Sequence, residues 1–367
     1  MTKISNAAAI DKKDYPNGNK KKDIFAIEEF CADRQDFLTK ILTDFEDHLT
    51  EKAGHFLGYH VNLDLNHLMD LSPLLRFHIN NAGDPFKDSS FISVLDWFGQ
   101  LWEIEKDECW GYVTNGGTEG NFQGLLLGRE LLADGKLYTS RESHYSVFKA
   151  ARMFRMDCII IRTLTTGEID CNDLREKLCL NKDKPAIINL NIGTTFKGGV
   201  DNLDLVIKTL EECGFSNDRF YIHCDAALSG LISPFLEQLL SLNVKGRLGL
   251  QQDVKCFDEC SILERSPKDA GIESMLNEMS FVVVFERPPN PEFIKYWNLS
   301  CEGNMTHVIA MPHVTVKMLE DFVNDFVQER NIWYQCGQIQ PPCLAKEIGT
   351  SNCCCSIHGK GGLQNGN

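Results

Sequence analysis

The sequence predicts an α/β fold in which a mostly parallel sheet forms a large domain and a smaller α+β domain follows. Two observations lead to this prediction. Between residues 137 and 227, short apolar segments alternate with amphipathic segments of helical period, as in strands joined by crossover helices. After Gly230 the alternation stops, and a helix, two strands and another helix are expected, which suits a separate α+β domain.

Ahead of the alternating region, apolar residues recur at helical spacing. In residues 24–52 they stand three or four positions apart among acidic residues, and residues 90–106 carry a similar apolar stripe. A third helix is expected over residues 122–132, directly after a glycine-rich turn. The chain is therefore predicted to enter its sheet through helices.

The parallel sheet is predicted from four apolar segments that helices separate. Continuous apolar strands are typical of a sheet that is covered on both faces. Strands are expected at residues 137–140, 158–161, 186–193 and 219–227, with helices at 144–156, 171–180 and 203–213 between them. Ligands of such sheets bind beyond the carboxyl ends of the strands, so the residues that follow each strand are candidates for a shared pocket.

The later elements and the low-pattern ends complete the predicted organisation. A helix is expected at residues 250–263, strands at 281–285 and 306–310, and a helix at 315–329. We therefore divide the chain into a flexible N-terminal arm (1–22), an N-terminal helical segment (23–90), a cofactor-binding large domain (91–247), a small C-terminal domain (248–334) and a flexible tail (335–367).

Composition limits the classes of partner. The chain has 367 residues, of which 43% are hydrophobic and 24% charged, as in ordinary globular proteins. Its net charge of −15 argues against nucleic acid or an anionic membrane as a partner. No apolar run is long enough to span a bilayer or to form a signal peptide, so we expect a cytoplasmic protein. The 15 cysteines are accordingly expected to be reduced thiols.

Residues 111–121, Gly-Tyr-Val-Thr-Asn-Gly-Gly-Thr-Glu-Gly-Asn, form a glycine-rich turn before a predicted helix. The first N–H groups of a helix have no partner within it, and glycine lets a ligand approach the backbone closely. An anion such as phosphate can therefore bind there. The segment matches neither common glycine-rich phosphate motif, and an ordinary tight turn with a capped helix is the alternative.

Three features near the strand ends match the needs of pyridoxal phosphate. The glycine turn supplies N–H donors for the phosphate. Asp225 follows a strand, and a buried carboxylate keeps the pyridine nitrogen protonated, which makes the ring an electron acceptor. His144 offers a ring that can stack on the cofactor, and Ala227 is small enough to pack on its other face. Each residue alone has a plainer explanation, such as a turn or helix cap, but the combination favours a cofactor site.

The segments that carry these residues resemble the plant serine decarboxylase and histidine decarboxylase group of pyridoxal-phosphate enzymes. The resemblance rests on residues 114–121, 140–149, 191–195, 221–226 and 275–278. It spans roughly residues 25–330, and in its details the chain is most similar to members labelled histidine decarboxylases. The implied fold is aspartate-aminotransferase-like, the type I fold of pyridoxal-phosphate enzymes, and the implied assembly is a homodimer whose two chains line each site.

The resemblance also implies roles for individual residues. Gly117 and Thr118 would hold the phosphate, and His144 would stack on the ring and contact the substrate. Thr194 would face the ring hydroxyl group, and Asp225 would pair with the pyridinium nitrogen. The small residue two positions after this aspartate would support the other face of the ring.

The sequence departs from the family at a chemically important segment. Family members carry the Schiff-base lysine in a Ser-x-His-Lys segment shortly after the strand that bears the aspartate, and this sequence has no such segment. Residues 234–238 match the family just after that strand, whereas residues 248–255 resemble the helix that leads to the C-terminal domain. We interpret this as an internal deletion near residues 238–246. Lys245 lies near the junction.

The implied reaction is the decarboxylation of an amino acid, with L-histidine as the substrate and histamine as the product. L-Serine, which would give ethanolamine, is one alternative. A catalytically inactive paralogue or splice form that pairs with intact subunits is another. His60 stands where relatives usually have proline, in a loop near the substrate end of the family site, so the choice of substrate can differ.

The cysteine run Cys353-Cys-Cys355 near the C-terminus raises the question of a metal. No C-x-x-C pair with a partner pair is present, so no metal is expected and these residues are predicted to be unliganded thiols of the tail.

Overall fold

The structure is a computed structural model that describes residues 34–60, 95–96, 99–100, 102, 104–105, 110–230, 260, 262–311, 313–335, 340–355 and 357–358. The chain forms two compact units, residues 1–52 and 53–367. Helix α1 (Arg34–Ala53) occupies the described part of the first unit, where a helix was predicted. The predicted N-terminal arm and most of the predicted helix 90–106 lie outside the described residues.

The first sheet of the second unit is entirely parallel, which confirms the predicted mostly parallel sheet. It consists of β1 (Lys136–Ser140), β2 (Cys158–Ile161), β3 (Ala186–Asn191) and β4 (Phe220–Asp225), in the order β2-β1-β3-β4. The next strand in sequence after β1, which is β2, lies on one side of β1, and β3 and β4 lie on its other side. The direction of the strand order therefore reverses between β1 and β3. Such a switch point opens a crevice at the carboxyl ends of the strands.

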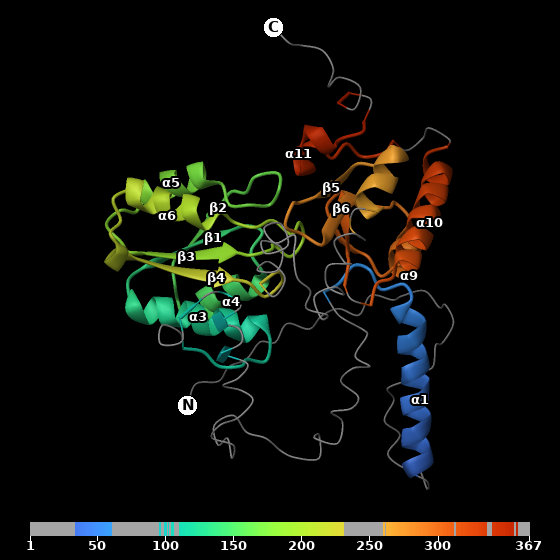
Figure 1. Cartoon of the computed structure of the whole chain (residues 1–367), viewed down its shortest axis with the longest axis horizontal. Helices are drawn as coiled ribbons and strands as arrows, with labels where there is room; N and C mark the ends of the chain where they lie inside the picture. The colour runs from blue at the N-terminus through green and yellow to red at the C-terminus, as the bar shows by residue number, and fades with distance from the viewer. Residues whose placement is uncertain are drawn as a thin grey trace, which may run out of the picture. The chain divides into compact units, whose positions relative to one another are not determined.

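Helices cover both faces of this sheet (Figure 1). Helices α3 (Gly117–Leu131) and α4 (Tyr145–Met153) pack on one face, and α5 (Cys171–Leu180) and α6 (Leu203–Glu212) pack on the other. Successive strand residues point to opposite faces. Leu137 and Ile187 accordingly join the core with α3 and α4, while Tyr138 and Ile188 join the core with α5 and α6.

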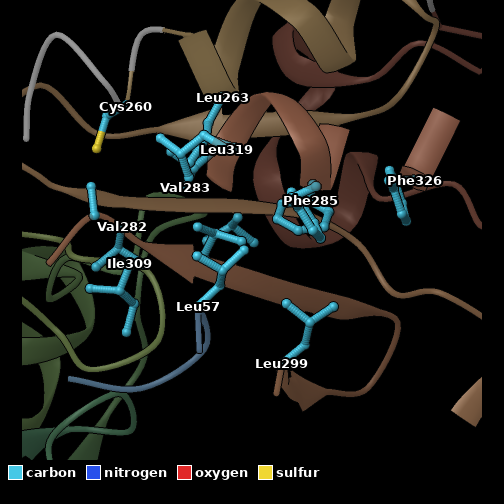
Figure 2. Packing of buried hydrophobic residues seen from close by; sticks show 14 of the residues in the cluster. Leu57, Cys260, Leu263, Val282, Val283, Phe285, Leu299, Ile309, Leu319 and Phe326 are labelled. Carbon is cyan, nitrogen blue, oxygen red and sulfur yellow. The ribbon is translucent and has the colours of Figure 1, made fainter. Parts of the chain in front are cut away.

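The second sheet is antiparallel and belongs to the C-terminal part of the chain. Its strands are β5 (Ser274–Leu276), β6 (Val282–Glu286), β7 (Ser300–Glu302) and β8 (Met305–Ile309), in the order β5-β6-β8-β7. Helices α9 (Pro291–Tyr296) and α10 (Val316–Tyr334) complete this region. Figure 2 shows part of its core, a single cluster to which Val283, Phe285, Leu319, Phe326 and Leu57 all belong.

Side chains of this second sheet region hold the loops that follow β2 and β3. The Nδ2 group of Asn277 donates hydrogen bonds to the carbonyl oxygens of Thr166 and Lys197, both at 2.8 Å. A ring nitrogen of His307 lies 2.9 Å from the carbonyl oxygen of Phe196. These two loops at the carboxyl end of the parallel sheet are thus held by residues of the C-terminal part.

The structure differs from the sequence-based expectation in the C-terminal elements. Strands β5 and β7 and helix α9 were not predicted, because three to six residues are too few to show a period. Residues 335–367 were expected to be a flexible tail. Part of this segment instead forms α11 (Ala345–Ile348) and the 3-10 turn η5 (Thr350–Asn352), and it buries Leu344 and Ile348 in the core. None of the helices within the described ranges combines the length and the apolar character that crossing a bilayer requires.

Candidate functional site

A cavity of about 290 Å³ lies where the parallel strands end. Asn191 is the last residue of β3 and Asp225 the last residue of β4, and the two are paired in register. The described residues that line the cavity are His60, Gly117, Thr118, Asn121, His144, Tyr145, Asn191, Gly193, Thr195, Asp225, Ala227 and Leu228. The cavity is therefore in the crevice that the strand order predicts.

One wall of the cavity is the N-terminus of α3. Its cap residue Gly116 has a φ of 98° and provides no side chain to accept hydrogen bonds from the first N–H groups of the helix. A side chain at the next position is also excluded, because a Cβ added to Gly117 would lie 2.5 Å from the Cβ of Ala227. Both Gly117 and Thr118 line the cavity, so their N–H groups and the positive end of the helix are available to an anion.

The carboxylate-bearing residue Asp225 also lines the cavity. The side chain of Asp225 is almost buried, and its Oδ2 accepts a hydrogen bond of 2.7 Å from Nδ2 of Asn121. Its Oδ1 accepts a hydrogen bond of 3.2 Å from the N–H of Ala227. Within the described part of the chain, no salt bridge pairs Asp225 with a cation. Its negative charge is therefore left for a positively charged group in the cavity.

A chain of hydrogen bonds connects this carboxylate to the imidazole of His144. Asn121 uses its second amide hydrogen on Oγ of Ser146, at 2.9 Å, and this oxygen lies 2.7 Å from Nδ1 of His144. Because Oγ accepts from Asn121, the Ser146 hydroxyl donates to Nδ1, and neutral His144 then carries its proton on Nε2. The Asn121 carbonyl faces Nε2 of His223 at 2.8 Å, so His223 is the donor of that bond.

His60 closes the cavity from the segment that follows α1. Its Nε2 is buried without a hydrogen-bond partner in the described structure. Burial, and then the charges of His307 and His144, lower the pKa of His60 to about 4. His60 is therefore an uncharged imidazole at neutral pH, with one ring nitrogen available to a ligand.

Five of the six predicted site residues line this cavity, and Thr194 does not. The Thr194 side chain is buried within the loop after β3, where its Oγ1 accepts a hydrogen bond of 2.9 Å from the N–H of Gly199. The neighbouring Thr195 lines the cavity instead. Thr194 thus lies outside the described lining of the cavity, and the role that the resemblance implies for it stays a prediction. The five residues that line the cavity are Gly117, Thr118, His144, Asp225 and Ala227.

Two residues of the hydrogen-bond chain were not singled out from the sequence. Asn121 lies four positions after Gly117, and residues four apart occupy the same face of a helix. This spacing was the available signal that Asn121 faces the cavity. Ser146 has a weaker signal, because a serine in the first turn of a helix is common for capping reasons alone.

No lysine is among the described residues that line the cavity. Lys197 is the buried lysine of the loop after β3, but its Nζ donates to the carbonyl oxygens of Thr165 and Glu347, at 3.1 Å and 2.8 Å. Lys245 and Lys255 lie outside the described residues.

The described residues fit the non-covalent requirements of pyridoxal phosphate. The unpartnered N–H groups at the start of α3 suit its phosphate, and the uncompensated carboxylate of Asp225 suits a protonated pyridine nitrogen. His144 and Ala227 supply an imidazole ring and a small apolar group at the same cavity. The lysine that holds the aldehyde in the family is not supplied by the described lining.

Residues 90–244 match the family model described as the pyridoxal-dependent decarboxylase conserved domain. Serine decarboxylase 1 of Oryza sativa subsp. japonica is 46% identical over 91% of this chain and 85% of its own length. A histidine decarboxylase of Solanum lycopersicum is 44% identical over 87% of this chain and 95% of its own length. The two alignments extend over 410 and 396 residues, more than the 367 of this chain, so the relatives contain residues that this chain lacks.

Solved structures with the same fold include two lyases of amino-acid and lipid substrates. The L-methionine decarboxylase from Streptomyces sp.590 gives a TM-score of 0.70 at 19% identity, over 83% of this chain and 98% of its own. The sphingosine-1-phosphate lyase from Burkholderia pseudomallei K96243 gives a TM-score of 0.67 at 14% identity, over 84% of this chain and 95% of its own. At this identity the likeness shows the fold alone, and it agrees with the expected aspartate-aminotransferase-like architecture.

Proposed function

The chain belongs to the pyridoxal-dependent decarboxylase family, whose members remove the carboxyl group of amino acids with pyridoxal phosphate, and from this premise we propose that its own substrate is L-histidine. When bound, the cofactor supplies an electron sink for the bond that breaks. The observation that carries the substrate proposal is His60, an uncharged imidazole that lines the cavity and whose Nε2 has no hydrogen-bond partner in the described structure. It can form a hydrogen bond with a neutral polar side chain such as that of histidine.

The proposed roles of the other residues follow from their positions. The N–H groups of Gly117 and Thr118 bind the phosphate, and Asp225 keeps the pyridine nitrogen protonated. His144 stacks on the ring, with its orientation set by the bond to Ser146, and Ala227 packs on the other face. Asp225 is the only charged residue in the described lining, which also favours a substrate side chain without a full charge.

The substrate proposal is tested by measuring the amines that the purified full chain forms with pyridoxal phosphate. We expect histamine from L-histidine, and a higher KM for L-histidine in His60→Ala. The matched control is His55→Ala, because His55 packs against Tyr296 and does not line the cavity. Formation of ethanolamine from L-serine, without histamine from L-histidine, would contradict the proposal and support its main rival, decarboxylation of L-serine. That rival is supported by the 46% identity to a serine decarboxylase.

A second candidate function is a non-catalytic subunit that binds the cofactor and pairs with an intact relative. It is favoured by the absence of lysine from the described lining of the cavity. The test is an absorbance spectrum with pyridoxal phosphate, followed by borohydride reduction and peptide mapping. Covalent label on a lysine would support the enzyme, and Lys245→Met would show whether Lys245 is that lysine. Reversible uptake without label, together with co-purification of a full-length relative, would support the subunit.

We also propose that the chain assembles as a homodimer. Its support, beyond the family, is the set of large apolar side chains that are exposed on and before α3, among them Trp110, Val113 and Leu131. Burial of such a group in a subunit interface would remove it from water. Light scattering on the purified chain should give twice the mass of one chain, and a monomer at micromolar concentration would contradict this proposal.

A further inference from the structure

Four potential metal ligands converge in the segment after α10. They are the thiols of Cys343, Cys353 and Cys355 and the imidazole of His358, and their ligand atoms all lie within 4.8 Å of one another. The cluster is separate from the cofactor cavity, whose lining contains none of these residues. From this geometry we propose that the chain binds one structural Zn²⁺ ion at these four residues.

Five of the six distances between the ligand atoms are close to the edges of a tetrahedron around zinc. Zn–S bonds of about 2.3 Å and Zn–N bonds of about 2.0 Å place two sulfurs about 3.8 Å apart and a sulfur and a nitrogen about 3.5 Å apart. Sγ of Cys343 lies 3.7 Å from Sγ of both Cys353 and Cys355. The three sulfurs lie 3.5, 3.7 and 3.2 Å from Nδ1 of His358.

The kind of metal and the kind of site follow from the ligands. Three thiolates and one imidazole in a tetrahedral arrangement are typical of a structural Zn²⁺ site. All four positions are supplied by the protein, so none is left for a substrate. Each thiol that binds the ion first loses its proton to the solvent, and the site should therefore bind zinc more weakly as the pH falls.

A buried carboxylate positions one of the ligands. Glu273, which is almost fully buried, accepts a hydrogen bond of 2.9 Å from Sγ of Cys353 through Oε1. Its Oε2 accepts a hydrogen bond from the N–H of Leu344, the residue after the first ligand. In the metal-free chain Glu273 thus connects the two halves of the ligand loop. The bond from Cys353 is given up when this thiol loses its proton to bind zinc, and the bond from Leu344 remains.

The ion would fix a segment that contacts the loop after β3. The ligand loop contains α11 and η5, and its Leu344 and Ile348 are part of the core. The carbonyl oxygen of Glu347 accepts the hydrogen bond from Lys197, which lies in the loop after β3. We infer that zinc anchors this loop segment against the C-terminal sheet region, where apolar burial alone involves only a few side chains.

The cysteine between two ligands provides a matched control. Cys354 is exposed, and its Sγ points to the carbonyl oxygen of Ile272 at 3.8 Å instead of to the cluster. Cys354→Ser should therefore keep the metal, whereas Cys355→Ser, one position away, should lose it. Both variants change one thiol to a hydroxyl in the same short segment.

The test is to purify the full chain in reducing buffer without chelator, add Zn²⁺, remove the excess and measure zinc by mass spectrometry. We expect one zinc per chain in the parent and in Cys354→Ser, and no stoichiometric zinc in Cys355→Ser or His358→Ala. Replacement by Co²⁺ should give the visible bands of a tetrahedral, thiolate-bound ion.

Three results would overturn the proposal. They are a parent chain without stoichiometric zinc or cobalt, equal zinc content in Cys355→Ser and Cys354→Ser, and a disulfide between two of the three cysteines found by peptide mapping of the reduced-buffer sample. None of these measurements uses the decarboxylation reaction. The zinc site and the proposed function can therefore fail independently.

Discussion

Asn121 connects three polar groups that do not contact one another. Its side chain donates hydrogen bonds to Asp225 and Ser146 and accepts one from His223, and it is 3% exposed. An amide has two donor hydrogens and an acceptor oxygen, so asparagine can satisfy all three partners at once. Neither aspartate nor leucine, which have a similar size, can do so. This residue therefore sets both the position of Asp225 and the tautomer of His144.

We predict that Asn121→Ala lowers the free energy of unfolding by about 2 kcal/mol and weakens pyridoxal phosphate binding by about tenfold. The buried partners lose their hydrogen bonds, which costs about 1–3 kcal/mol for each unsatisfied group. Denaturant unfolding and cofactor titration by fluorescence measure the two effects. Asn172→Ala is the matched control, because Asn172 is exposed on α5. Equal effects in the two variants would disprove the role of Asn121.

His60 should make the stability of the chain sensitive to acid. Its pKa is about 4 in the folded chain and 6.5 for an unperturbed histidine, so the unfolded chain binds more protons between these values. Stability therefore rises with pH through this window and is lost as the pH falls below 6.5. From pH 7 to pH 5 the loss is about 2 kcal/mol. Urea unfolding of His60→Gln at the two pH values should show a loss smaller by that amount. A parent-like loss would contradict the assignment.

Helix α3 packs against β4 so closely that some of its glycines cannot be replaced. A Cβ added at Gly124 would overlap Nδ1 of His223, and one added at Gly128 would lie 2.6 Å from Cδ1 of Tyr221. At Gly120 the nearest atom would be Oγ1 of Thr114, at 3.9 Å. Gly124 and Gly128 are therefore required for the close packing of α3 on β4, whereas Gly120 is not.

We predict opposite effects for two glycine-to-alanine changes in this helix. Gly124→Ala should destabilise the chain by about 1–3 kcal/mol, because the methyl group meets the His223 ring. Gly120→Ala should stabilise it by up to about 1 kcal/mol, because alanine has the higher helix propensity and space is available. Thermal unfolding of both variants measures the difference. Equal stability of Gly124→Ala and Gly120→Ala would contradict this prediction.

Helix α10 is tied to β6 by a buried ion pair. Arg330 donates from Nε to Oε1 of Glu286 at 2.5 Å and from a terminal nitrogen to Oε2 at 3.1 Å, and Glu286 is 1% exposed. Arg330→Met should cost about 3–5 kcal/mol, because it leaves a buried carboxylate unpaired. Arg175→Met breaks the exposed pair with Glu212 and should cost at most about 1 kcal/mol. Similar unfolding midpoints for the two variants would refute this difference.

The elements with long, regular apolar patterns are those that the sequence predicted well. The strands and helices from residue 136 to residue 225 lie where they were expected, and α10 begins one residue after its predicted start and runs on to Tyr334. The short elements were missed because a strand such as β5 has three residues and takes its place from β6, its partner in the sheet. Tertiary pairing of this kind leaves little trace in the local sequence.

The cofactor site could be predicted because its residues follow strands that meet at one edge of the sheet. The roles of Asp225 and His144 toward a cofactor stay predictions, whereas their position at one cavity was predicted in this way. The position of Thr194 was not, because the turn that directs its hydroxyl group to Gly199 depends on contacts from Asn277 and Ser280 in the C-terminal part. The four-residue cysteine and histidine cluster was also missed, because its spacing follows no common motif and only the folded loop brings its members together.

At the scale of the whole second unit, Lys197 joins three distant segments. Its ammonium group contacts the carbonyl oxygens of Thr165, after β2, and Glu347, in α11, while its backbone carbonyl accepts from Asn277. Charged hydrogen bonds of this kind contribute about 1.5–3 kcal/mol each when they are buried. The C-terminal segment is thus held to the parallel sheet by a single side chain as well as by its own core contacts.

We predict that Lys197→Met loosens the C-terminal segment without unfolding the parallel sheet. Amide hydrogen exchange should speed up in residues 345–349 by about tenfold or more, because the lost bonds restrained this segment. Exchange in β3 should stay slow. Lys184→Met is the control, since Lys184 forms an exposed pair with Asp134. Unchanged exchange in residues 345–349 would show that the core contacts alone hold the segment.

The amide of Asn121 also prevents proton transfer between the two ionisable groups that it connects, Asp225 and His144. A carboxylate and an imidazole linked through hydroxyl groups or water can pass a proton along the line. An amide keeps both of its hydrogens at physiological pH, so the line from Asp225 to His144 is interrupted for protons at Asn121. The hydrogen bonds fix the relative positions of Asp225 and His144 but transfer no proton between them. A proton therefore cannot pass along this line between a group bound at Asp225 and one bound at His144.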